Sequence, residues 1–430
     1  MDSESQGGDL ATTGDRRELD QTVAPARALD WPLPRAGTPV ERVFGRARPA
    51  IASRVTLRTI ARLAGLFVVW RCGILLVSAG WGRLPVVTGW PSEIDIMWLF
   101  RYSVRWDSGW YLTIASDGYS YDPAYPSSVA FFPLFPLLIR LFDALLPGSD
   151  VFAALVVVHL ALGGALIYIY RLIAAEYGDR IAWRSVYFFL IFPGAFFFSA
   201  VYNEALLLLA AAGALYHARR GQWVWAALFG VLGSATKLVG VLLLIPLAVE
   251  LLSQRGRSLR DLRPGLWILA APLGAVAYFA YLQATFGSFR VFFDTEAHWH
   301  REPFSAVMLM GVQYLAGDAG PLRFYPPNSM TLAPAYLILD TTLLWLFLAA
   351  GVILWRRYRP TYGAFVLAFT LVPALSGSPQ SVNRYVAVLF PAFILLAHIR
   401  SEAARAILSI ALILALAFTT HLFVNGYWAG

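Results

Sequence analysis

Apolar residues occur in long runs over most of the chain, from Leu57 to Val424, and short polar clusters separate these runs. Many of the runs approach about 20 residues, the length at which a helix crosses the hydrocarbon of a bilayer. A backbone inside the bilayer must satisfy its hydrogen bonds within itself, and a helix does so. The pattern therefore predicts an all-α polytopic membrane protein.

Basic residues concentrate in the short clusters between the apolar runs, which is the pattern of cytoplasmic loops. The clusters lie at residues 171–184, 219–220, 255–263, 356–359 and 400–405. They all face the cytoplasm only if residues 130–146 do not cross completely and residues 223–252 cross twice, turning near Lys237. Each half of 223–252 is short for a full crossing. This parity predicts about eleven transmembrane helices, with the tail after Val424 outside.

The chain before the first apolar run differs from the rest. Residues 1–53 are rich in Gly, Pro, Asp and Arg and have no apolar periodicity, so we expect a disordered cytoplasmic tail without a cleavable signal peptide. Arginines at 54, 58 and 62 follow, and they direct the first span outward. Residues 54–430 then form one transmembrane domain. Its first extracytoplasmic loop, 80–150, is expected to carry surface helices.

Composition excludes several functional classes. The chain is 58% hydrophobic and only 14% charged, more apolar than a soluble fold requires. Its formal net charge of +8 does not indicate a nucleic-acid partner, because the basic residues lie between spans rather than along one face. The single cysteine, Cys72, cannot form an intrachain disulfide. Walker motifs, Gly-rich phosphate loops and a nucleophile elbow are absent from the sequence, which disfavours ATP-driven transport.

Polar residues fall together on the outer side of this topology. They come from the 80–150 loop, the segment 202–204, Lys237, a second large outer loop at 286–330, and the turn at 376–384. Charges at membrane depth are costly and usually line a cavity. Their convergence predicts a single outward-facing site.

The segment Arg105-Trp106-Asp107 places an acid among aromatic residues in the first outer loop. On a helix, Trp110 and Tyr111 would lie beside the carboxylate, at i+3 and i+4. A carboxylate near sugar hydroxyls can act as a general base, and the flanking rings can stack on a sugar or a polyprenyl chain. The alternative is that Asp107 caps an interfacial helix within an aromatic belt.

Two further acids have both structural and functional interpretations. Asp122 precedes Pro123 and either starts a turn or contacts substrate. Glu204, in Tyr202-Asn203-Glu204, interrupts two apolar runs. It either belongs to the site, with Tyr202 beside it, or favours the dipole of a helix that Asn203 caps.

Two cations are placed to meet a phosphate. Lys237 lies deep in apolar sequence, where it needs an anionic partner such as Glu204 or a lipid phosphate. Arg384 starts a span on the outer side, where the alternative is snorkelling to the interface. His298 and His300 are two residues apart and would point to opposite sides of a strand or loop. We therefore expect acceptor binding there, and no metal or other cofactor.

The motifs together resemble the phosphatidylinositol-glycan class V type of mannosyltransferase. The resemblance rests on Arg105-Trp106-Asp107, then Gly118-Tyr119, then Ala130-Phe131-Phe132-Pro133. Tyr202-Asn203-Glu204-Ala205-Leu206 is similar to the family's Tyr-Ser-Glu-Ala-Leu, and Arg384-Tyr385 near Pro391 is a weaker likeness. The similarity is concentrated between about residues 98 and 245.

This resemblance implies the multispanning GT-C glycosyltransferase architecture and a polyprenyl-phosphate-linked mannose donor. The family's outer-loop acid corresponds to Asp107, and its later Glu corresponds to Glu204. The chain departs from the family in two places. Asp122 stands where relatives often have Glu, and Lys237 stands where they often have Arg, a change that loses bidentate phosphate binding.

The eukaryotic members act on a glycolipid anchor precursor in the endoplasmic reticulum. An Arg- and Ala-rich chain without a retention signal is more typical of a bacterial plasma membrane. We therefore do not expect the anchor precursor to be the acceptor of this protein. We expect mannose transfer, with inversion, to a lipid-linked or cell-envelope glycan on the outer face. The remaining alternatives are transfer of arabinofuranose, galactofuranose or glucose from a polyprenyl phosphate, and a lipid-sugar flippase or transporter.

Overall fold

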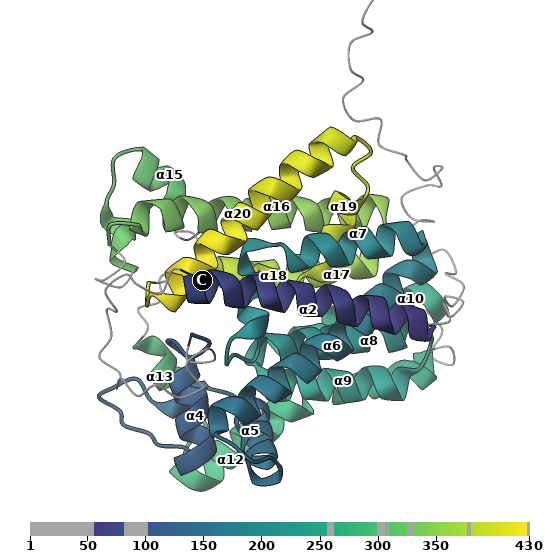
Figure 1. Ribbon diagram of the computed structural model, residues 1–430. Helices are drawn as coiled ribbons and strands as arrows, with labels where there is room; N and C mark the ends of the chain where they lie inside the picture. Colours follow the sequence, from purple (N-terminus) through teal and green to yellow (C-terminus); the bar gives the residue numbers. More distant parts are fainter. Residues whose placement is uncertain are drawn as a thin grey trace, which may run out of the picture. The chain divides into compact units, whose positions relative to one another are not determined.

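The computed structural model describes residues 56–80, 102–255, 262–298, 307, 309–324, 330–375 and 380–427. Within these ranges every regular element is a helix (Figure 1). The all-α prediction is therefore confirmed for the described part of the chain. The predicted disordered tail at 1–53, His300 and parts of both large outer loops lie outside it.

Five helices are long and apolar enough to cross a bilayer, which makes the chain an integral membrane protein. They are α2 (Leu57–Gly80), α6 (Asp150–Tyr177), η4 with α12 (Arg263–Ala270 and Leu273–Phe286), α16 (Ala333–Arg357) and α20 (Glu402–Val424). A sixth crossing results if α7 (Asp179–Leu190) and η2 (Pro193–Ser199), bent by 82° between them, form one broken span. The predicted count of eleven is not confirmed.

The difference in count arises from short helices. Residues 223–252, predicted to cross twice, form α9 (Trp223–Thr236), η3 (Leu238–Leu243) and α10 (Leu244–Arg255), with the break at Lys237. Each piece is shorter than a full crossing requires. The same holds for α17 (Pro360–Leu375). Helix α5 (Leu134–Leu145) has 12 residues, too few for a full crossing.

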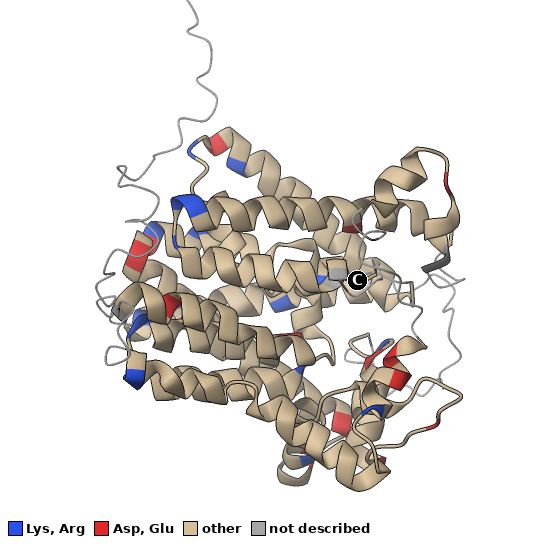
Figure 2. Ribbon diagram, turned by 180° about the vertical axis from the view of Figure 1, so that it is seen from behind, with Lys and Arg blue, Asp and Glu red and all other residues tan. Residues whose placement is uncertain are grey.

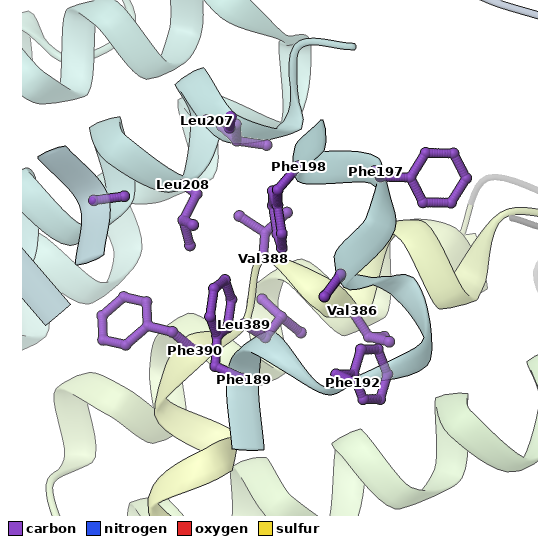
Figure 3. Close-up of a cluster of buried hydrophobic side chains, with 14 of the residues drawn as sticks. Phe189, Phe192, Phe197, Phe198, Leu207, Leu208, Val386, Val388, Leu389 and Phe390 are labelled. Atoms are coloured by element: carbon purple, nitrogen blue, oxygen red, sulfur yellow. The ribbon is translucent and has the colours of Figure 1, made fainter. Parts of the chain in front are cut away.

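A core of aromatic and aliphatic side chains joins three segments that are distant in sequence. Figure 3 shows Phe197 and Phe198 of η2, Leu207 and Leu208 of α8 (Glu204–Arg219), and the Val386–Phe390 segment gathered in one region. A Cβ at Gly194 would collide with the backbone oxygen of Asn383. Glycine therefore permits η2 to pack closely against α18 (Val382–Ala387). This packing brings the start of α8 near Arg384.

Basic residues from two of the predicted cytoplasmic clusters form ion pairs with acids on neighbouring helices. Arg219 Nε lies 2.7 Å from Glu176 Oε1, and Arg359 Nη2 lies 3.2 Å from Glu250 Oε1. These pairs join the ends of α6, α8 and α10 to the start of α17. Figure 2 shows many of the Lys and Arg residues at this end of the helices, away from α4 (Ser108–Asp117) and α13 (Val291–Ala297). Such an asymmetry is typical of cytoplasmic ends.

Candidate active site

A cavity of about 770 Å³ lies where α4, α8, η3, α13, α17 and α18 meet. Part of its wall is polar and carries five charged residues: Asp107, Glu204, Lys237, Glu296 and Arg384. The rest is apolar, with Leu238, Val241 and Leu242 of η3 and Phe369 and Val372 of α17. The cavity therefore suits an amphipathic ligand with a charged head and a hydrocarbon chain.

Four of the predicted site residues form a continuous set of ion pairs. Arg384 Nη1 lies 2.5 Å from Asp107 Oδ2, and Arg384 Nε lies 3.4 Å from Glu204 Oε1. Lys237 Nζ lies 3.1 Å from the same Glu204 oxygen. The Glu204 side chain is only 1% exposed, whereas that of Asp107 is 24% exposed. Glu204 is thus buried between the two cations, and Asp107 faces the cavity.

The segment before α4 positions Asp107. Its carboxylate makes no side-chain cap hydrogen bond to α4, so capping does not explain this residue. The backbone of Trp106 has a φ of 51°, a region that costs energy for a bulky residue. Arg105 donates to the backbone oxygen of Val424 at 2.8 Å, and the Arg105 carbonyl accepts from the Tyr202 hydroxyl at 3.1 Å. These bonds tie the segment to α20 and to the start of α8.

A close approach of two backbone segments positions Lys237. A Cβ at Gly240 would collide with the carbonyl of Gly233, so η3 packs against the last turn of α9 only because this residue is glycine. Asn203 does not cap α8; its side-chain amide donates to the backbone oxygen of Thr236 at 2.9 Å. The Lys237 turn is therefore held from both sides.

Aromatic rings hold both cations. Lys237 Nζ lies 4.5 Å from the centroid of the Tyr385 ring. The Arg384 guanidinium lies 5.1 Å from the same ring and 5.4 Å from that of Tyr202. Cation–π contacts of this kind stabilise a desolvated cation without neutralising it. The two cations are therefore held at the cavity wall by aromatic faces as well as by carboxylates.

Tyr111 lines the cavity beside the acids, with its side chain buried. Burial raises the pKa of its hydroxyl well above the usual value, and the charges of Glu204 and Asp107 raise it further. The phenol therefore stays neutral and can donate a hydrogen bond. Trp110 does not line the cavity; its ring stacks on that of Phe131, with 5.6 Å between the ring centroids.

Ala130, Phe131 and Phe132 of the Ala130-Phe131-Phe132-Pro133 motif line the cavity. The Tyr119 hydroxyl donates to the carbonyl of Phe131 at 2.8 Å, and the Tyr278 hydroxyl donates to that of Val129 at 2.7 Å. The ring of Phe132 lies 5.7 Å from that of Phe292 on α13. The motif thus connects α13 to α12 and to the segment after α4.

Some predicted residues lie away from the cavity. Asp122 is exposed, and its Oδ1 accepts from the backbone nitrogen of Ala124, as expected of a turn. His298 Nδ1 lies 3.1 Å from the backbone oxygen of Asp294 at the end of α13. Arg105 and Trp106 support the segment that carries Asp107. Among the described residues, no three His, Cys, Asp or Glu side chains lie close enough to hold a metal ion.

Glu296 lines the cavity and did not emerge from the sequence interpretation. The available signal was an acid that follows the aromatic pair Phe292-Phe293 in an outer loop. Of the two histidines predicted to bind the acceptor, His298 does not line the cavity, and His300 lies outside the described residues.

Comparison with known proteins agrees with the fold and the motifs. No curated protein sequence matches the chain. The ArnT structure from Cupriavidus metallidurans bound to undecaprenyl phosphate is similar, with a TM-score of 0.50 and 17% identity, and the match covers 81% of this chain. The chain spans 62% of the length of that ArnT structure. This likeness supports the GT-C-like fold.

Weaker similarity extends to an archaeal enzyme. The Archaeoglobus fulgidus oligosaccharyltransferase tethered to an acceptor peptide matches with a TM-score of 0.41 and 14% identity, over 86% of this chain and 56% of that one. The sequence comparison identifies a family, whereas these structures support only the fold. Residues 74–271 match the model of the mannosyltransferase (PIG-V) family, which confirms the family resemblance predicted from the motifs.

Proposed function

We propose that this protein is a membrane mannosyltransferase that uses a polyprenyl-phosphate-mannose donor. The mannose is transferred, with inversion, to a lipid-linked or cell-envelope glycan at the extracytoplasmic side. One observation carries the proposal: Asp107, Lys237 and Arg384 converge in an amphipathic cavity, and Asp107 and Lys237 lie in the family-matched region.

The two cations are suited to the donor phosphate. Lys237 and Arg384 reach the cavity and are held by aromatic faces and by Glu204. A phosphate that binds there replaces carboxylates as their partner and forms charge-assisted hydrogen bonds. The apolar wall of η3 and α17 is suited to the prenyl chain. Undecaprenyl phosphate, to which the similar ArnT structure is bound, has this same combination of groups.

Asp107 is suited to act as the general base. In the proposed step, the acceptor hydroxyl oxygen attacks the anomeric carbon of the mannose from the face opposite the phosphate. The bond from that carbon to the phosphate oxygen breaks, its electron pair stays on the phosphate, and the hydroxyl proton passes to the Asp107 carboxylate. Lys237 and Arg384 offset the charge that grows on the leaving phosphate. Attack from the opposite face inverts the anomeric configuration.

The test is transfer by the purified full-length protein in lipid nanodiscs. It is incubated with polyprenyl-phosphate-[³H]mannose and a bacterial membrane lipid extract, and the anomeric configuration of the product is read by NMR. We expect a radioactive glycolipid from the wild type and from the Asp117→Asn variant, whose changed residue is exposed on the same helix as the site. We expect none from Asp107→Asn.

Other outcomes would assign a different function. Preferred use of arabinofuranose, galactofuranose or glucose donors would reject mannose. Retained configuration would reject inversion. Movement of an intact donor across the membrane of vesicles that contain the protein, without cleavage, would identify a flippase.

A further inference from the structure

Helix α13 places an acid in the cavity for which the proposed reaction has no assigned role. Glu296 lines the same cavity as Asp107, Glu204, Lys237 and Arg384. The two cations form ion pairs with Asp107 and Glu204. Glu296 therefore adds a third carboxylate to a cavity in which the phosphate-binding charges are already arranged on α18 and at the Lys237 turn.

The packing of α13 determines which side chains it presents. Val291, Phe292 and Thr295 are buried, and Phe292 packs edge-on against Phe132. Phe293 and Glu296 are three residues apart, so they lie on one face of the helix, and both line the cavity. Phe293 is 50% exposed. The helix thus presents an accessible aromatic ring and a carboxylate side by side.

This pair has the chemistry of a sugar-binding surface and not of a phosphate-binding one. A carboxylate repels a phosphate but accepts hydrogen bonds from hydroxyl groups, with a strength above that of neutral acceptors. An aromatic ring can pack on the apolar face of a pyranose. The donor phosphate is attracted to Lys237 and Arg384, so the second sugar of the reaction is left for α13.

We propose that Phe293 and Glu296 form the acceptor-sugar subsite. This inference rests on the proposed function. The Glu296 carboxylate accepts hydrogen bonds from acceptor hydroxyls that do not react, and Phe293 supports the face of the ring. The pair thereby orients the reacting hydroxyl toward Asp107.

The test uses the full chain with polyprenyl-phosphate-[³H]mannose as donor and octyl α-D-mannopyranoside as acceptor, with the membrane lipid extract in parallel. In Glu296→Gln we expect the half-saturating acceptor concentration to rise roughly tenfold or more, as for a lost hydrogen bond to a charged group. The turnover at saturating acceptor, the donor KM and the melting temperature stay unchanged. Phe293→Leu should show the same pattern.

Asp294 supplies the matched control. It is an exposed acid on the same helix, two residues away, and it does not line the cavity. Asp294→Asn should leave all the kinetic constants unchanged. The subsite would be overturned if Asp294→Asn raised the half-saturating acceptor concentration as much as Glu296→Gln does. It would also be overturned if Glu296→Gln left that concentration unchanged or raised the donor KM. A wild type that consumes no donor with either acceptor would contradict the proposed function itself.

Discussion

Arg384 Nη1 lies 2.5 Å from the Asp107 carboxylate, although 277 residues separate the two in the chain. In this arrangement the proposed phosphate cation and the proposed base neutralise each other. In the proposed reaction, the donor phosphate competes for Arg384 and leaves the Asp107 carboxylate available for the acceptor hydroxyl. Glu204 stays beneath both cations and keeps them from separating.

Removal of the base should abolish transfer without unfolding the protein. Asp107→Asn and Asp107→Ala are expected to lower turnover on the order of a hundredfold or more, the range for loss of a general base. Turnover is measured with radioactive donor and folding by thermal unfolding, with Asp117→Asn as the control. Near-normal turnover of the Asn variant would remove Asp107 from the proposed mechanism.

A double variant separates donor binding from stability at Lys237. Lys237→Gln leaves Glu204 buried with one cation fewer, which should cost on the order of a few kcal/mol of unfolding free energy. Adding Glu204→Gln removes the carboxylate that is left with Arg384 as its one remaining cation, and should restore much of the stability. Donor affinity should remain roughly tenfold or more below wild type in both variants, because the phosphate contact is lost. Calorimetry with polyprenyl phosphate measures this affinity.

The same experiment includes a conservative substitution. Lys237→Arg should retain most of the donor affinity, since it keeps the charge. If the double variant recovered both stability and donor affinity, Lys237 would be a purely structural cation.

The close packing at Gly240 should be necessary for the Lys237 turn. Gly240→Ala introduces a Cβ that collides with the Gly233 carbonyl, so η3 must move away from α9. We expect a lower melting temperature and weaker donor binding. Gly163→Ala is the control, because nothing lies within 4 Å of its added Cβ and alanine favours a helix interior. A Gly240→Ala variant as stable and active as Gly163→Ala would show that the turn tolerates displacement.

The predicted topology can be tested across a single span. Helix α16 (Ala333–Arg357) separates the exposed residue Ala319 from the exposed Arg357. In a Cys72→Ala background, Ala319→Cys should react with an impermeant maleimide on intact cells. Arg357→Cys should react only after permeabilisation, because it lies in a cytoplasmic basic cluster. The opposite labelling pattern would place the cavity on the cytoplasmic side.

The sequence by itself identified the class of protein and predicted most of the candidate site residues. Apolar runs predict membrane helices because insertion into a bilayer depends on the hydropathy of the segment itself. Charged residues within apolar sequence also stand out, because their burial is costly unless they have partners. Asp107, Lys237 and Arg384 are such residues. These residues, with Glu204, could be proposed for one site without coordinates.

Only the tertiary structure decided which partners these residues have. Whether Arg384 meets Asp107 depends on the packing of η2 against α18 at Gly194, a contact between segments far apart in the chain. Only the structure shows that Asn203 bonds Thr236 instead of capping α8, and that Glu296 lines the cavity while Asp122 lies in a turn. The number of spans is also decided in the tertiary structure, because side chains of other segments satisfy the backbone at the breaks. Asn203 donates to the carbonyl of Thr236 where α9 ends, and Thr419 donates to that of Pro193 where η2 bends away from α7. Such contacts cannot be predicted from the local sequence, because they depend on how side chains of distant segments pack once the helices have assembled.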